Sequence, residues 1–277
     1  MSGSTVYATG YNNGSSGGGL WKQTAGGTWA KDAAFPATMA IYPNSVAVSP
    51  TNGNIILVGT DGGLWGTTNG GGMWSQRVAG SPNFYGGGVA KVVAFDPTDG
   101  NTVYVGSSTT GLYKSTDGGT VWSSVNSLIN DQPVSSIAVD KNNGGANVFI
   151  GLKKGVWKSM ASGFNWFDSS AGLTARPVRS LATTATAGTL YAGTFNGGVF
   201  KTTDGGQNWG PASGSAAMVL PFRDQTVGAL ALDPAAPNVV LILPGESPAP
   251  AEPNPVESSL QLVPPLVVRT TFPKLPA

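Results

Sequence analysis

The chain has 277 residues, of which 40% are hydrophobic and only 10% are charged, and its net charge is +1. This length suits one large all-β domain, and the charged fraction lies well below the roughly 25% of an average soluble protein. The chain has no Cys and no His, which excludes disulfides, thiol nucleophiles, Ser-His-Asp catalysis and imidazole metal sites. The chain has no basic stripe and no run of about 18 apolar residues, so we expect no nucleic-acid partner and no membrane insertion. We also expect no metal and no cofactor.

Short apolar stretches recur along the chain and predict the first two strands of a repeating unit. The expected first strands are 45–49, 92–95, 137–139, 181–184 and 230–232. The expected second strands are 6–9, 55–58, 103–105, 148–150, 190–192 and 239–243. The chain therefore begins at a second strand and ends with an extra first and second strand.

Tryptophans give the period of the repeat. Trp29, Trp74, Trp122, Trp166 and Trp209 are separated by 45, 48, 44 and 43 residues. Residues 112–122 read LYKSTDGGTVW and residues 199–209 read VFKTTDGGQNW, so each Trp closes a similar segment. The second copy has Asn in place of Asp, and the first and fourth copies lack the acid. With a strand before the motif and one starting at the Trp, each unit has four short strands, which is one propeller blade.

This motif resembles the Asp box, or BNR repeat, Ser/Thr-x-Asp-x-Gly-x-x-Trp, over nearly all of the chain up to about residue 245. Sialidases, xyloglucanases, sortilin-type receptors and photosystem assembly factors share this repeat, and all are β-propellers. The resemblance implies an all-β propeller of four-stranded antiparallel blades with five clear repeats, and a degenerate sixth blade closed by a strand near 266–271 stays open. A turn carboxylate accepts backbone N–H bonds and the Trp packs between sheets, so we interpret these positions as structural: Asn69, Trp74, Asp117, Trp122, Trp166, Asp204 and Trp209.

The composition changes near the C-terminus, where residues 244–257 are rich in proline. We therefore divide the chain into a propeller, residues 1–245, and a Pro-rich arm, residues 246–277. Such a segment is extended, and it serves either as a linker or strap or as an arm that docks on a neighbouring subunit. The second interpretation predicts a homo-oligomer or larger assembly.

Propeller topology separates the loops into two faces. The Asp boxes lie on one face, whereas the second-to-third loops and the blade-to-blade loops share the other, where propellers usually bind ligands. The ligand-binding candidates on that face are Asn12, Asp61, Tyr85, Lys153, Lys154, Arg176, Phe195, Asn196 and Arg223. The same loops also carry Asn13, Tyr42, Thr109, Asp131, Asp168, Arg179 and Asp224.

The main functional hypothesis is a non-catalytic binding or scaffolding protein. Low charge suits a glycan held by stacking and hydrogen bonds on the face opposite the boxes, and a protein partner or assembly through the C-terminal arm is the variant of this hypothesis. The N-terminal residues 1–7 lack the basic and apolar regions of a signal peptide. The expected location is extracellular or at a virion or cell surface.

The alternative hypothesis is an inverting glycoside hydrolase of the xyloglucanase type. Residues 60–65, TDGGLW, look like the stretch that carries one catalytic Asp in that family, which makes Asp61 a candidate. Such enzymes need two carboxylates, and in that family the second comes from another propeller, so Asp61 would need Asp224, Asp131 or another subunit. A sialidase is improbable because the chain has five Arg and no Glu before residue 246.

Overall fold

The computed structural model describes residues 5–10, 19–24, 27–36, 42–77, 89–125, 129, 132–212, 226–232 and 240–244. These residues form antiparallel β-strands and one short 3-10 helix, η1 (Lys141–Asn143). Within the described part of the chain, no helix is long and apolar enough to cross a membrane. The all-β class predicted from the sequence is confirmed.

The strands are grouped into sheets that follow the chain order, and we number them accordingly. Sheet 1 contains β1 (Val6–Gly10), β2 (Gly19–Gln23) and β3 (Ala30–Lys31), and sheet 2 contains β4 (Pro43–Val48), β5 (Ile56–Thr60), β6 (Gly63–Thr67) and β7 (Ser75–Gln76). Sheet 3 contains β8 (Ala90–Asp96), β9 (Asp99–Ser107), β10 (Leu112–Ser115) and β11 (Ser123–Ser124). Sheet 4 contains β12 (Val134–Asp140), β13 (Asn147–Leu152), β14 (Gly155–Ala161) and β15 (Phe164–Asp168). Sheet 5 contains β16 (Val178–Thr183), β17 (Leu190–Thr194), β18 (Val199–Thr202) and β19 (Gly210–Pro211), and sheet 6 contains β20 (Val227–Leu232) and β21 (Val240–Pro244).

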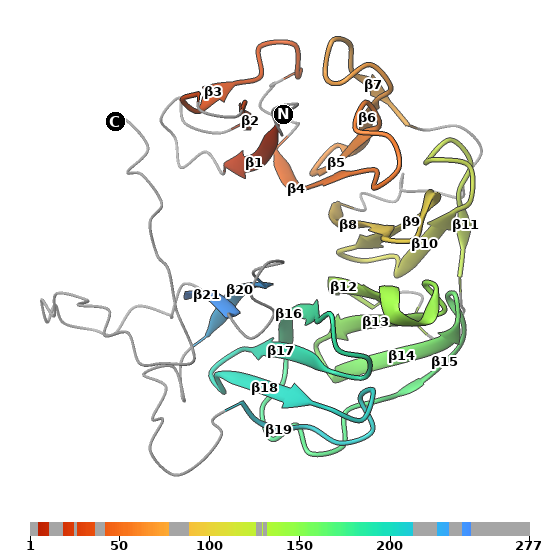
Figure 1. Cartoon of the computed structure of the whole chain (residues 1–277), viewed down its shortest axis with the longest axis vertical. Coiled ribbons are helices and arrows are strands. Elements are labelled where there is room, and N and C mark those ends of the chain that lie inside the picture. Colours follow the sequence, from red (N-terminus) through yellow and green to blue (C-terminus); the bar gives the residue numbers. More distant parts are fainter. Residues whose placement is uncertain are drawn as a thin grey trace, which may run out of the picture.

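The sheets lie side by side around a central space (Figure 1). In each of sheets 2 to 5 the four strands pair in sequence order, with the first strand toward the middle and the fourth at the rim. The inner strands β4, β8, β12, β16 and β20 pack on one another in that order, and β1 packs on β4. The predicted first and second strands are therefore confirmed. The predicted closing strand at 266–271 and the arm at 246–277 lie outside the described residues.

Apolar clusters join neighbouring sheets, and the repeated tryptophans take part in them. Trp122 packs with Leu57 of sheet 2, Trp166 with Tyr104 of sheet 3, and Trp209 with Phe149 of sheet 4. These three tryptophans are almost fully buried, so each adds a large apolar area to the contact with the preceding sheet.

The first two tryptophans of the repeat, Trp29 and Trp74, are less buried than the three described above. Trp29 and Trp74 are only partly buried, although Trp74 lies edge-on to Phe35 of sheet 1 with ring centroids 5.2 Å apart. Sheet 1 has three strands among the described residues, whereas sheet 3 and sheet 4, which support Trp166 and Trp209, have four.

A β-bulge recurs at the same place in all five inner strands. The pairing register shifts between Pro43 and Ser45, and at the equivalent positions of β8, β12, β16 and β20. The residues skipped by the ladder are Asn44, Lys91, Ser135, Arg179 and Gly228. Bulges bend a strand and re-aim a side chain, and they are frequent beside active sites. This makes the start of each inner strand a place where side chains differ while the backbone repeats.

Candidate functional site

The turns between third and fourth strands share one construction, and we call them the turn edge: residues 67–74, 115–122, 159–166 and 202–209. In the turns at 115–122 and 202–209 a carboxylate accepts hydrogen bonds from two backbone N–H groups of the same turn. Asp204 Oδ1 accepts the N–H groups of Gln207 and Asn208 at 2.9 and 3.0 Å, and Asp117 Oδ1 accepts those of Thr120 and Val121 at 2.9 and 3.0 Å. The carboxylate therefore replaces ladder hydrogen bonds where the strands separate.

These hydrogen bonds also change the acidity of the two carboxyl groups. The N–H of Asn208, the hydroxyl of Thr202 and the side-chain amide of Asn208 hold the pKa of Asp204 down at about 2. For Asp117, burial pushes the pKa upward, but donation from Val121, Ser115 and Thr120 outweighs it and the pKa is lowered. Both groups are therefore stabilised as anions in the folded turn.

The second turn shows that an amide oxygen can do the same work. Asn69 Oδ1 accepts the N–H of Met73 at 2.9 Å and the hydroxyl of Thr67 at 2.7 Å. The structure thus places Asn69, Asp117 and Asp204 in equivalent turns, as the sequence pattern predicted for their positions.

The fourth turn has Ala161 where the other turns have Asn69, Asp117 and Asp204. Ser162 and Gly163 adopt positive φ angles of 50° and 95°, as the paired glycines of the other turns also do, and Ala161 pairs directly with Phe164. The carbonyl of Ser162 accepts Lys114 Nζ at 2.8 Å, from the preceding sheet. In the next turn Gly205 O accepts Lys158 Nζ at 2.8 Å, so a lysine of the third strand reaches the following turn in both cases.

The hairpins between second and third strands form the opposite edge of the sheets, and we call them the hairpin edge: residues 60–63, 107–111, 152–155 and 194–198. Thr60, Ser107 and Thr194 are buried, and each hydroxyl bonds within its own hairpin. The next residue in each of these hairpins donates its N–H to a carbonyl just before the inner strand: Asp61 to Tyr42, Ser108 to Val89 and Phe195 to Pro177. The hairpins are consequently fixed against the inner strands, while their tips are exposed.

Asp61 occupies the tip of the sheet 2 hairpin, is exposed, and has a defined partner on the inner strand. Its Oδ1 accepts Asn44 Nδ2 at 2.9 Å, and Lys91 Nζ approaches Asn44 Oδ1 at 3.5 Å. Asn44 and Lys91 are the bulge residues of β4 and β8, so two neighbouring bulges converge on one hairpin tip. A carboxylate, an amide and an ammonium group form a polar corner that can hydrogen-bond hydroxyl groups of a ligand.

A second corner lies on sheet 5. The guanidinium of Arg179, the bulge residue of β16, lies 5.1 Å from the centre of the Phe195 ring. Asn196 next to it has a φ angle of 56°, and its Oδ1 accepts the buried hydroxyl of Thr226 at 3.0 Å. These contacts orient Arg179 and Asn196 at the hairpin edge, although both side chains are exposed.

The other candidates fall into two groups. Lys153 and Lys154 form the exposed tip of the sheet 4 hairpin, and Arg176 is exposed in the segment that leads from sheet 4 to sheet 5. Thr109 and Asp168 are exposed, and Tyr42 is half-buried. The candidates Asn12, Asn13, Tyr85, Asp131, Arg223 and Asp224 lie outside the described residues.

Sequence reasoning did not single out three residues that the bulges bring to this edge: Asn44, Lys91 and Ser135. The third of these, Ser135, has its hydroxyl oxygen 2.8 Å from Gly151 O and 2.5 Å from Val178 O, so its single proton is shared between carbonyls of sheet 4 and sheet 5. The sequence did contain an indication of these residues. When the inner strands are aligned, one position holds Asn, Lys, Ser, Arg and Gly in turn, whereas the positions on either side of it vary less.

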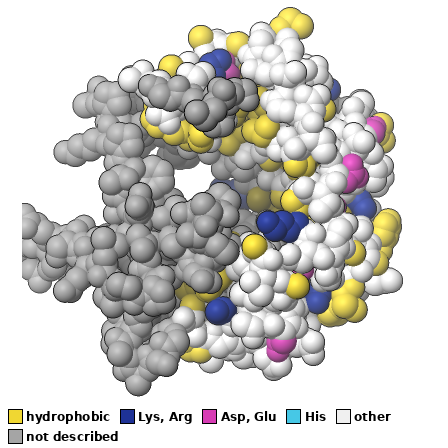
Figure 2. Space-filling view, viewed as in Figure 1, with side chains coloured by type: hydrophobic (Ala, Val, Ile, Leu, Met, Phe, Trp, Pro, Cys, Tyr) yellow, Lys and Arg dark blue, Asp and Glu magenta, His cyan; other side chains and the backbone are white. Residues whose placement is uncertain are grey.

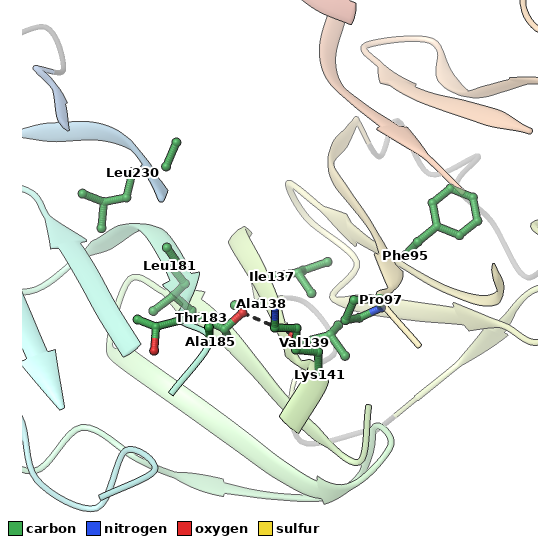
Figure 3. Close-up of a pocket in the computed structure, with 13 residues that line it drawn as sticks. Phe95, Pro97, Ile137, Ala138, Val139, Lys141, Leu181, Thr183, Ala185 and Leu230 are labelled. Atoms are coloured by element: carbon green, nitrogen blue, oxygen red, sulfur yellow. Dashed lines mark hydrogen bonds between the residues drawn. The ribbon is translucent and has the colours of Figure 1, made fainter. Parts of the chain in front are cut away.

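The inner strands also border a pocket of about 420 Å³ in the middle of the molecule (Figure 3). Its walls are mostly aliphatic, from Ile137, Leu181 and Leu230, and Lys141 is the one charged side chain among the described residues that line it. The hydroxyl of Thr183 donates to Val139 O at 3.4 Å and is not free for a ligand. Figure 2 shows a hollow at the centre, with hydrophobic and a few basic side chains beside it. The pocket offers few polar groups for a sugar.

No protein-family model matches the chain. A xyloglucanase of Hypocrea jecorina is 28% identical over 193 residues, which is 68% of this chain and 20% of the relative. A xyloglucanase of Acetivibrio thermocellus is 26% identical over the same share of each chain, so this chain spans about a fifth of the length of the curated relatives it matches.

Solved structures resemble the whole arrangement of sheets. The GH74 enzyme of Niastella koreensis superposes with a TM-score of 0.67 at 23% identity, covering 87% of this chain and 42% of that one. A structure described as YCF48 bound to D1 peptide superposes with a TM-score of 0.58 at 17% identity, covering 82% of this chain and 70% of that one. The four-stranded sheets, their radial order and these superpositions together give the chain the fold of the β-propellers.

Proposed function

We propose that this chain binds a β-linked glucan along its hairpin edge and contributes one carboxylate, Asp61, to inverting hydrolysis of the xyloglucanase type. The observation that carries the proposal is the Asp61 corner, in which an exposed carboxylate is oriented by the Asn44 amide at 2.9 Å. The names of the two curated relatives support the substrate class. This proposal reverses the order of the two hypotheses drawn from the sequence.

Inverting hydrolysis has two carboxylate roles, and Asp61 would fill one of them. In an inverting hydrolase one carboxylic acid protonates the leaving oxygen, while a carboxylate activates water on the opposite face of the sugar. Asn44 holds one oxygen of Asp61, and no described residue donates a hydrogen bond to the other oxygen. We assign Asp61 to one of these two roles. The second carboxylate comes from Asp131, from Asp224 or from another propeller.

The turn edge has a different role in this proposal. We interpret the four repeated turns as Asp boxes that hold the sheets in place and do not contact the glycan. We also place the protein outside the cell, where a polysaccharide substrate occurs.

The test compares two substitutions of the same kind at opposite edges. Purified protein is incubated with xyloglucan and other β-glucans, binding is measured by affinity electrophoresis, and new reducing ends and their anomeric form are followed by NMR. We expect Asp61→Asn to keep glucan binding and to lower turnover by about 10²- to 10⁴-fold, the usual contribution of a general acid or base. Asp204→Asn is the matched control, since Asn already occupies the equivalent turn position at Asn69.

The outcomes separate the hypotheses. Glucan binding with no product by wild type would favour the second candidate, a lectin-like protein, for which the Asn44 and Lys91 partners at Asp61 are sufficient. Equal turnover by wild type and Asp61→Asn would remove Asp61 from the mechanism. Neither binding nor turnover with any β-glucan would reject the proposed function.

A further inference from the structure

Basic side chains gather on one sector of the hairpin edge, across sheets 4 and 5. Lys153 and Lys154 occupy one hairpin tip, Arg176 leads into sheet 5, and Arg179 is its bulge residue. All four are exposed. The single ion pair recorded among the described residues, between Lys22 and Asp32, lies on sheet 1. We call these four side chains the basic sector.

Packing brings the basic sector together. A side chain at Gly155, next to Lys154, would lie 3.5 Å from Arg176 Nε. The opposite hairpin is equally close, because a side chain at Gly197 would overlap the methyl group of Ala175. Arg176 therefore lies between two hairpin tips, one carrying lysines and the other carrying Phe195.

Two further contacts distinguish the sector from scattered surface charge. Arg179 is stacked on Phe195 at 5.1 Å, which orients its guanidinium before a ligand arrives. Ser135 bonds both Gly151 O and Val178 O, so the strands that carry the lysine hairpin and Arg179 are joined directly. Among the described residues Asp168, at the end of β15, precedes the segment that carries Arg176, and its Oδ1 accepts the N–H of Ser170 at 2.9 Å.

We propose that the basic sector is an anionic subsite that takes the carboxylate groups of a uronate-containing polysaccharide. This inference rests on the proposed function, because the subsite continues along the same edge as the Asp61 corner and defines which glycan lies there. Arginine presents paired N–H donors that match a carboxylate, and lysine adds an unspecific positive charge. Among the described residues of this sector the cations outnumber the acids, and a neutral glucan would leave this positive charge unpaired.

The experiment measures the affinity of the full chain for a β-1,4-linked oligoglucuronate and for a neutral xyloglucan oligosaccharide by calorimetry, at about 20 and about 200 mM salt. Exposed ion pairs are weak and screened by salt, each contributing about 2- to 5-fold in affinity. We expect Lys153→Gln/Lys154→Gln and, separately, Arg176→Gln/Arg179→Gln to weaken oligoglucuronate binding about 5- to 20-fold at the lower salt. Lys141→Gln, which removes an exposed charge on the opposite face, should leave it unchanged.

Each result supports or overturns the subsite. Salt-sensitive binding of the uronate that both double variants weaken supports it, even where the neutral glucan is not hydrolysed and the proposed reaction fails. Tighter binding of the neutral oligosaccharide with no effect of salt or of the variants overturns the subsite and leaves the proposed function standing. If poly-glutamate binds as tightly as the uronate, the sector is assigned to an acidic protein instead. If the chain binds neither the uronate nor the neutral oligosaccharide, both proposals are overturned. Thermal unfolding of the variants checks that they fold.

Discussion

The two edges of this molecule are built from the same strands but follow opposite rules. At the turn edge Asn69, Asp117 and Asp204 accept nearly the same hydrogen bonds at nearly the same distances. At the hairpin edge the hairpins of sheets 2, 3 and 5 repeat a hydroxyl contact and an N–H contact. The exposed side chains nevertheless differ, with Asp61 on sheet 2, Lys153 on sheet 4 and Asn196 on sheet 5. Uniform side chains indicate a stabilising role, whereas a constant backbone with variable side chains indicates a surface specialised for a ligand.

The largest expected effect tests the stabilising side of this comparison. Trp166 is 6% exposed, packs with Tyr104 of the preceding sheet, and donates Nε1 to Gly163 O at 2.8 Å. Trp166→Ala should lower the free energy of unfolding by about 3–5 kcal/mol, because it removes a large buried ring and leaves a cavity. Denaturant titration measures this loss.

The matched variant is Trp74→Ala, at the equivalent position of sheet 2. Trp74 is only partly buried and its Nε1 has no hydrogen-bond partner among the described residues, so its loss should be clearly smaller. Equal losses at the two positions would show that sheet 1 supports sheet 2 as fully as sheet 3 supports sheet 4.

A smaller effect is expected from the turn carboxylate. Asp204→Ala removes the acceptor of two backbone N–H groups and should destabilise the protein by about 1 kcal/mol, a modest value because the turn is exposed to solvent. Asp204→Asn keeps one acceptor oxygen and should cost less. An alanine variant as stable as wild type would mean that water satisfies these N–H groups equally well.

Acid should weaken the turn edge. The pKa of Asp204 is about 2 in the folded turn and 3.8 in the unfolded chain, so the ionised form is favoured by folding. Its contribution is complete above about pH 4 and is lost as the pH falls toward 2. Denaturant midpoints measured from pH 5 to pH 2 should fall less steeply for Asp204→Asn than for wild type. Parallel curves would contradict the assignment.

The sequence predicted the turn edge better than the hairpin edge, for a physical reason. The turn residues are close in sequence, so Ser115, Asp117 and Trp122 show their relation as spacing. Asp61 could be placed at a hairpin tip in the same way. Its partner Asn44 could not, since their contact depends on the pairing of Pro43 with Thr60 and on the bulge after Pro43. The acid-free fourth turn keeps the positive φ of the other turns, with Ser162 where they have Gly, and nothing in the structure explains why it lacks the acid.

The smallest expected effect on stability gives the sharpest contrast, because one substitution can be made at both edges of sheet 2. Asn44→Ala removes a half-exposed side chain whose partner, Asp61, can turn to water, so the free energy of unfolding should change by less than about 0.5 kcal/mol. Glucan turnover should nevertheless fall several-fold, since Asp61 loses the amide that orients it. Asn69→Ala should do the reverse, costing about 1 kcal/mol of stability by leaving the Met73 N–H without its acceptor, with turnover unchanged. Turnover assays and denaturant titration of the two variants measure all four values, and a shared profile would mean that the two edges are not functionally separate.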